Sequence, residues 1–141
     1  MGLYLTDGHK LEIERHGVET YPHECCGFLV GSIDAENSTV RETVRAVNTR
    51  TDTPSNRFEI DPLELMKVDR AARAKSLTVV GFYHSHPDAP ARPSEYDRER
   101  AWPGYCYVIV SVHSGKVVDF LNWRLKDDRS AFESDPISIE H

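Results

Sequence analysis

The chain alternates between segments whose apolar residues recur at helical spacing and segments that are apolar throughout or alternating. Residues 9–21 show the helical spacing up to Pro22, which cannot continue a helix. In residues 61–74, DPLELMKVDRAARA, an Asp precedes a Pro at the first helical position, an arrangement typical of a helix start. We therefore expect two helices in these segments and a short third helix in SEYDRERA, residues 94–101.

The apolar and alternating segments predict strands. LTVVGFY, residues 77–83, is a continuous apolar run rich in β-branched and aromatic residues, which indicates a central strand buried on both faces. Residues 105–112 and 116–125 flank the short turn HSG and predict an antiparallel hairpin. Shorter strands are expected in CCGFLVG (25–31), TVRETVRAVN (39–48) and RFEI (57–60). Strands and helices alternate irregularly, so the pattern predicts an α/β fold with a mixed sheet flanked by helices.

Length and composition narrow the class of protein. At 141 residues the chain fits one domain, and its net charge of -6 argues against a nucleic-acid partner, which would need clustered basic surface. The longest apolar runs fall far short of the roughly 18 residues that span a membrane. The N-terminus shows no basic segment leading into an apolar stretch, so we expect a cytoplasmic protein. Three cysteines do not make a disulfide framework and are expected to be small buried groups.

Two histidines at the end of the predicted central strand are the first candidates for chemistry. In FYHSHPDAPARPSEYD, residues 82–97, His84 and His86 are one residue apart, so in an extended chain both side chains point to the same face. Such a pair can bind one metal ion. Chance alone, however, produces an H-x-H pair in about a third of shuffled chains of this composition. The pair by itself therefore does not predict a metal site.

Ser94 and Asp97 follow the histidines across a proline-rich loop. Alone, S-x-x-D at a helix start is an ordinary N-cap arrangement. Together with H-x-H at a fixed offset, it lowers the chance expectation to on the order of 10⁻³. A first-turn acid also lies at the loop end of its helix, where it can face the two imidazoles. Two His and one Asp form a catalytic zinc shell with a fourth position open to water, so the composite predicts Zn²⁺ at His84, His86 and Asp97.

These residues resemble the JAMM, or MPN+, metalloproteases of the small prokaryotic type. The family pattern is H-[ST]-H-P, with seven residues before a Ser-x-x-Asp and a Glu upstream near a Gly-flanked apolar strand. Here HSHPDAPARPSEYD has seven residues, 87–93, and PHECCGFLVG supplies Glu24. The resemblance covers residues from about 9 to 124. It implies the MPN/JAMM fold, a mixed curved β-sheet flanked by helices and similar to that of cytidine deaminases, over residues 1–125. The composition of residues 126–141, with KDDRS and ESDP, separately predicts a polar, loosely ordered tail.

The resemblance also implies a role for each motif residue. It implies zinc bound by His84, His86 and Asp97, with Glu24 as the general base that takes a proton from the attacking water. Ser94 matches the serine that hydrogen-bonds the developing oxyanion, and its hydroxyl can still cap its own helix. Without the resemblance, Glu24 does not stand out among the glutamates.

The compact chain is most similar to prokaryotic members that act on ubiquitin-like or sulfur-carrier proteins ending in Gly-Gly. The resemblance therefore implies a zinc-dependent metallo(iso)peptidase. The bond cleaved at that Gly-Gly is the one to an isopeptide-linked protein, to a C-terminal extension or to a carrier-bound cysteine, and these alternatives stay open. The polar loop 48–57 is expected to help hold the body of the carrier.

Two other classes of protein are alternatives to a JAMM metalloprotease. A zinc deaminase would pair H-x-E with P-C-x-x-C, and neither string occurs. A non-catalytic MPN scaffold domain in a protein complex would lack metal ligands, whereas every ligand position is filled here. Ordinary surface or loop positions are expected for the other histidines: His9, His16, His23, His113 and His141. Three aromatic residues near the motif either line a substrate cleft or pack in the core: Tyr83, Tyr96 and Trp102.

Overall fold

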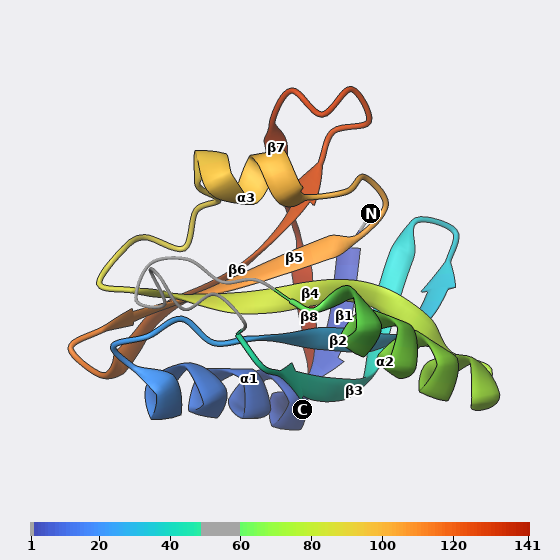
Figure 1. Ribbon diagram of the computed structural model, residues 1–141, viewed down its shortest axis with the longest axis horizontal. Coiled ribbons are helices and arrows are strands. Elements are labelled where there is room, and N and C mark those ends of the chain that lie inside the picture. Colours follow the sequence, from blue (N-terminus) through green and yellow to red (C-terminus); the bar gives the residue numbers. More distant parts are fainter. Residues whose placement is uncertain (1, 49–59) are drawn as a thin grey trace.

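The computed structural model describes residues 2–48 and 60–141, which form one curved mixed sheet with helices on both faces (Figure 1). The elements in chain order are β1 Gly2–Thr6, α1 Asp7–Thr20, β2 Cys26–Asp34, β3 Asn37–Ala46, α2 Pro62–Ala74, β4 Thr78–Pro87, α3 Glu95–Arg100, β5 Cys106–His113, β6 Lys116–Leu125, β7 Phe132–Asp135 and β8 Ile137–Glu140. The predicted α/β class is confirmed. The RFEI segment predicted as a strand falls, except for its last residue, outside the described ranges.

The sheet is nearly closed, because its two edge strands are neighbours along the chain. The strand order is β7-β6-β5-β4-β2-β3-β1-β8, with β4 parallel to β5 and β1 parallel to both β3 and β8. Only Pro136 separates β7 from β8, and its carbonyl accepts the Leu3 N–H at 2.9 Å. The two edges therefore meet, and because β1 and β8 run parallel, the two chain termini lie at opposite ends of this strand pair (Figure 1).

The prediction of a loosely ordered end from Lys126 is wrong. β7 pairs with β6, and β8 pairs with β1, itself a strand that the sequence pattern did not predict. β8 alternates between half-buried Ile137 and Ile139, which pack against the core, and exposed Ser138 and Glu140. Four alternating residues are a weak strand signal by themselves, and backbone pairing with β1 completes the order of the segment. The division at residue 125 into a domain and a tail stays a prediction.

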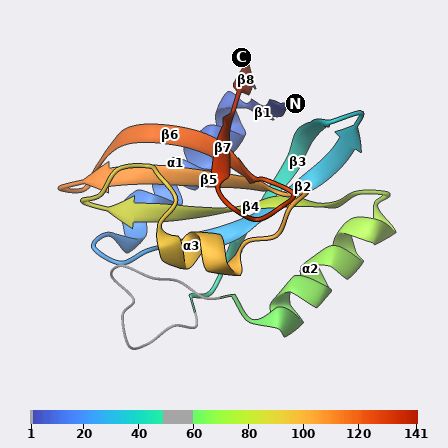
Figure 2. The ribbon, with the colours of Figure 1, turned by 90° about the horizontal axis from the view of Figure 1, so that it is seen from above.

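Helices cover opposite faces of the central strand β4. Val80 and Tyr83 belong to the core cluster under α1, and Val79 and Phe82 pack in the cluster under α2. The prediction that LTVVGFY is buried on both faces is thus confirmed. In Figure 2, α1 passes behind β4 to β6 while α3 lies in front of them. None of the helices in the described ranges is long and apolar enough to cross a membrane.

All three helices begin at capping side chains. The hydroxyl of Thr6 accepts the His9 N–H at 3.1 Å, and the His9 ring accepts the Thr6 N–H in return, so α1 begins two residues before the predicted start. Asp61 accepts the Leu63 N–H at 2.9 Å, which confirms the predicted start of α2. Ser94 caps α3, as the sequence predicts.

Two glycines allow close approach of neighbouring strands to β4 and β5. A Cβ at Gly27 in β2 would lie 2.2 Å from the ring of Tyr83, and a Cβ at Gly81 would lie 2.2 Å from the carbonyl oxygen of Cys106. No side chain fits at either position. These contacts keep β2, β4 and β5 in register at the end of the sheet that carries the histidines.

Candidate metal centre

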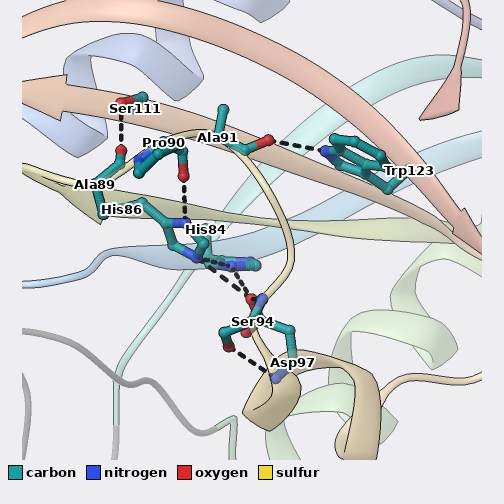
Figure 3. A network of polar contacts seen from close by, with 9 residues as sticks. All are labelled: His84, His86, Ala89, Pro90, Ala91, Ser94, Asp97, Ser111 and Trp123. Atoms are coloured by element: carbon teal, nitrogen blue, oxygen red, sulfur yellow. Dashed lines mark hydrogen bonds and ion pairs between the residues drawn. The ribbon is translucent and has the colours of Figure 1, made fainter. Parts of the chain in front are cut away.

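The end of β4 carries two buried histidines whose rings face each other. His84 and His86 are 2% and 8% exposed, and their Nε2 atoms lie 3.0 Å apart (Figure 3). Both side chains lie on the face of the sheet covered by α2 and α3, because residues two apart in a strand share a face. Ser85, the residue between the two histidines, points to the opposite face, where it lies against Gly17 of α1.

Asp97 reaches the same point from the first turn of α3. Its Oδ2 lies 3.4 Å from Nε2 of His84 and 3.3 Å from Nε2 of His86. A tetrahedral ion with ligands at about 2.0–2.1 Å has its ligand atoms about 3.3 Å apart. The three side-chain atoms are therefore spaced as three corners of such a site, and imidazole with carboxylate is a donor set that suits zinc.

His86 is oriented by the loop that follows it. Its Nδ1 lies 2.8 Å from the carbonyl oxygen of Pro90. A carbonyl oxygen only accepts, so Nδ1 carries a proton, and in the neutral ring Nε2 keeps a lone pair that a metal ion between His84, His86 and Asp97 could take up. This arrangement, with one ring nitrogen bonded to a backbone carbonyl, is the usual support of a metal-binding histidine.

Glu24 comes to the centre from the start of β2, 60 residues before the histidines. The Cys25 N–H donates to Oγ of Ser85 at 2.9 Å, and the Ser85 N–H donates to the Cys25 carbonyl at 3.2 Å. Ser85 thus ties the chain beside Glu24 to β4. Ligand atoms of Glu24, His84 and His86 all lie within 4.8 Å of one another.

The electrostatics of the centre follow from burial and from its opposite charges. Burial raises the pKa of Glu24, which is 5% exposed, to about 8. Burial also lowers the pKa of His84. For His86, burial is outweighed by hydrogen bonds to Asp97 and Pro90, so its pKa is raised. The two histidines likewise outweigh burial at Asp97 and hold the pKa of that carboxyl well below its usual range. Asp97 is therefore ionised and Glu24 is poised to exchange a proton.

Ser94 lies at the rim of the centre, on the Glu24 side. Its Oγ accepts the Asp97 N–H at 3.1 Å, and its own N–H donates to Oδ2 of Asp97 at 2.8 Å. The cap uses Oγ only as an acceptor, so the hydroxyl proton is available to donate to another oxygen. The two roles expected of Ser94 are thus compatible in this geometry.

Two hollows open on either side of the centre. A small one of about 230 Å³ includes Glu24, His86, Ser94 and Arg92. A larger one of about 430 Å³ has mostly apolar walls: Ile60, Pro62, Leu65, Phe82, His84, Tyr96, Asp97, Arg100, Ala101, Trp102 and Tyr107. The five motif residues predicted from the sequence are therefore brought together at one place between two hollows.

Some of the predictions for the other aromatic residues and histidines are confirmed and some are wrong. Tyr96 and Trp102 line the larger hollow, whereas Tyr83 is buried on the opposite face, where its hydroxyl lies 2.7 Å from Nδ1 of His16. The expectation of a surface role for His16 is therefore wrong, since it is 6% exposed. All three cysteines are buried and free, as expected. Three supporting residues were missed because a lone Ser or Trp in a strand carries no local signal: Ser85, Ser111 and Trp123.

Comparison with known proteins assigns the chain to a family. The family model for prokaryotic homologs of the JAB domain matches residues 6–126. The chain belongs to this prokaryotic JAB family. Among JAB relatives, a desampylase of Haloferax volcanii is 43% identical over 91 residues, and a probable TtuB-protein conjugate cleaving protease of Thermus thermophilus is 31% identical over 107 residues.

The extent of these matches differs between relatives. The desampylase match covers 64% of this chain and 63% of the desampylase, so the chain spans less than two thirds of that relative's length. The Thermus match covers 76% of this chain and 68% of the relative. Over the whole fold, a solution structure of a protein from Desulfitobacterium hafniense matches with a TM-score of 0.85 and 28% identity, covering 99% of this chain and 93% of that one.

Proposed function

We propose that this JAB protein is a zinc-dependent hydrolase that cleaves the bond at the C-terminal Gly-Gly of a ubiquitin-like or sulfur-carrier protein. That bond joins the terminal glycine to the lysine of another protein as an isopeptide, to a C-terminal extension, or to a carrier-bound cysteine. The observation that carries the proposal is the spacing of three donor atoms: Nε2 of His84, Nε2 of His86 and Oδ2 of Asp97 lie 3.0 to 3.4 Å apart. A non-catalytic scaffold domain does not require three metal-ligand atoms at this spacing.

The residues around this set supply the remaining parts of a hydrolytic site. When bound, zinc polarises a carbonyl and lowers the pKa of a water toward about 7. Glu24 takes the proton from the attacking water and passes it to the departing amine, since its pKa of about 8 lies near neutral pH. Ser94 donates its hydroxyl proton to the oxyanion that forms on the substrate. Asp97 stays ionised throughout.

A Gly-Gly tail suits the burial of this centre. Glu24, His84 and His86 are each less than a tenth exposed, so the scissile bond has to come close to backbone and ring atoms. Residues without a Cβ can approach such a crowded position, and larger side chains cannot. The relatives support the same substrate class, since one is named a desampylase and another is named for cleaving conjugates of TtuB with proteins.

The compartment belongs to the same proposal. All three cysteines are buried and unpaired, a usage typical of reducing surroundings. We propose a cytoplasmic location, where carrier proteins and their adducts would be accessible to the enzyme.

The test is cleavage of defined carrier adducts followed by mass spectrometry. One ubiquitin-fold carrier ending in Gly-Gly is prepared with a C-terminal cysteine, with a short peptide extension, and with an isopeptide link to a lysine. We expect release of the carrier at its terminal glycine from at least one adduct, and no release by Glu24→Gln protein.

A carrier with Ala-Ala in place of Gly-Gly is the matched substrate control. Cleavage of this control, or of an unrelated unfolded peptide, at the same rate as every Gly-Gly adduct would refute carrier specificity. Absence of zinc binding by the wild-type protein would refute the metal site itself.

A further inference from the structure

The segment 87–93 connects the two halves of the metal centre, with His84 and His86 before it and Ser94 and Asp97 after it. It contains three prolines, which have no N–H to donate. The loop therefore has few donors with which to stabilise its own conformation. A carbonyl of this segment that is buried, as at Ala91, needs a donor from elsewhere, because buried carbonyls are almost always paired.

Three successive carbonyls of this loop accept side-chain hydrogen bonds from three neighbouring strands. Ser111 of β5 donates from Oγ to the Ala89 carbonyl at 2.5 Å. The next carbonyl, of Pro90, accepts from His86 of β4 at 2.8 Å. Ala91 then accepts from the indole Nε1 of Trp123 of β6 at 2.9 Å. Figure 3 shows these three bonds in a row above the metal centre.

The three donors differ in how close they lie to the metal centre. His86 takes part in the centre with its other ring nitrogen. Ser111 pairs with His86 across β4 and β5, and Trp123 lies one strand further away. Ala91 is 1% exposed and stands three residues before Ser94, so the bond from Trp123 holds the loop just before it turns into α3.

We propose that Trp123 and Ser111 are positioning residues of the metal centre. By holding the Ala91 and Ala89 carbonyls, they set the place at which α3 begins and so the distance from Asp97 to the two histidines. Neither residue touches a reacting atom. The inference rests on the proposed metal site, and it assigns a task to two side chains that the hydrolytic chemistry does not use.

The test measures zinc affinity rather than turnover. Trp123→Phe keeps an aromatic side chain and removes the N–H with the five-membered part of the indole, so we expect its zinc dissociation constant to rise about 10-fold, the lower end of the range for residues that orient metal ligands. Trp102→Phe is the matched control, since Trp102 is 62% exposed and its indole makes no hydrogen bond to this loop. It should bind zinc as the wild type does. Affinities are obtained by competition with a chromophoric chelator.

Thermal unfolding of the metal-free proteins separates positioning from general stability. We expect metal-free Trp123→Phe to melt close to the metal-free wild type, with the loss visible only in zinc binding. A lowered melting temperature with unchanged zinc affinity would overturn the proposal and leave Trp123 a purely structural residue. If Trp123→Phe does not fold, the zinc affinity of Ser111→Ala tests the proposal instead, because removing one hydroxyl leaves a smaller gap in the core.

Ser111→Ala should weaken zinc binding in the same way, and Ser111→Ala with Trp123→Phe should weaken it by about 100-fold if the two bonds act independently. Unchanged zinc affinity in Ser111→Ala would overturn the inference. If the wild-type protein itself binds no zinc, the proposed metal site fails instead, so the two failures are distinguishable.

Discussion

Glu24 shows how strongly the chemistry of one residue depends on its surroundings. In the sequence it is one of many acidic residues, and in the fold it lies beside His84 and His86 with 5% of its surface exposed. Burial raises its pKa to about 8, close to the pH at which a general base and acid works best. The side chain is thus suited to proton transfer rather than to a surface ion pair.

We expect Glu24→Gln to bind zinc and to lose most turnover, because the amide keeps the shape of the side chain but does not accept the proton. The expected loss in kcat is about 10² to 10⁴. The measurement compares kcat on a cleavable carrier adduct with zinc content. Glu36→Gln, in the exposed turn between β2 and β3, is the control and should keep wild-type activity. Near wild-type turnover by Glu24→Gln would show that Glu24 is not the base.

His16 is a second buried residue with a strongly shifted pKa, on the opposite face of β4. Burial, with the charge of Arg45, lowers its pKa from 6.5 to about 4, although Glu19 acts in the other direction. The unfolded chain therefore binds one more proton than the folded chain between pH 6.5 and pH 4. The stabilising contribution is complete above pH 6.5 and is lost as the pH falls through this window.

We expect the free energy of unfolding to decrease by about 3 kcal/mol between pH 6.5 and pH 4 on account of His16. The measurement is urea unfolding of the wild type and of His16→Gln across this range, with His113→Gln as the exposed control. The difference between wild type and His16→Gln should increase as the pH rises from 4 to 6.5, by much more than the difference between wild type and His113→Gln changes. Parallel curves for all three proteins would contradict the prediction.

At the scale of elements, the contact between β2 and β4 brings Glu24 to the histidines. Cys26 pairs with His84, and Gly27 pairs with Tyr83, whose ring lies over the glycine. A side chain at Gly27 would displace this ring and disturb the register that aligns the two strands. The glycine therefore supports the site although it takes no part in the chemistry.

Gly27→Ala should destabilise the protein by about 3 kcal/mol, the upper range for adding one methyl group to a packed core. Gly8→Ala is the matched control. Its Cβ would have only an ordinary contact, 3.6 Å from Oγ1 of Thr6, and alanine favours a helix. We expect it to be neutral or stabilising in urea unfolding. Equal stability of Gly27→Ala and the wild type would show that the ring of Tyr83 moves aside freely.

At the scale of the whole molecule, the last two strands close the sheet. Asp135 at the end of β7 accepts from Arg124 Nε at 2.9 Å and from Asn122 Nδ2 at 2.8 Å. Arg124 also donates to Oγ of Ser38 on β3, which lies at the other side of the closing sheet. This buried group therefore connects β6 and β7, at one edge of the sheet, to β3 near the other edge.

We expect Asp135→Ala to cost about 3 kcal/mol, because it leaves Arg124 largely buried without its carboxylate. Glu133→Ala on the same strand is the control. Its partner Lys126 is 3.9 Å away and both side chains are about half exposed, so the loss should be below about 1 kcal/mol. Chemical unfolding measures both. A similar small effect of the two changes would show that closure does not depend on this ion pair.

The local features of the fold could be predicted because their causes lie within a few residues of one another. Asp61 and Ser94 begin helices through side chains that bond their own first turn, and LTVVGFY is buried on both faces because it has no polar side. The motif spacing likewise placed His84, His86 and Asp97 at one point, since a strand end, a short loop and a helix start leave them little freedom.

Only the tertiary structure decided which distant segments meet. Glu24 reaches the histidines through bonds between Cys25 and Ser85, Trp123 reaches the loop from β6, and residues 137–140 become a strand by pairing with β1. Each depends on the register between strands far apart in the sequence, and backbone pairing is open to almost any residue. The sequence by itself therefore determined which residues are proposed as ligands and the elements that carry them, and the closing of the sheet determined what surrounds them.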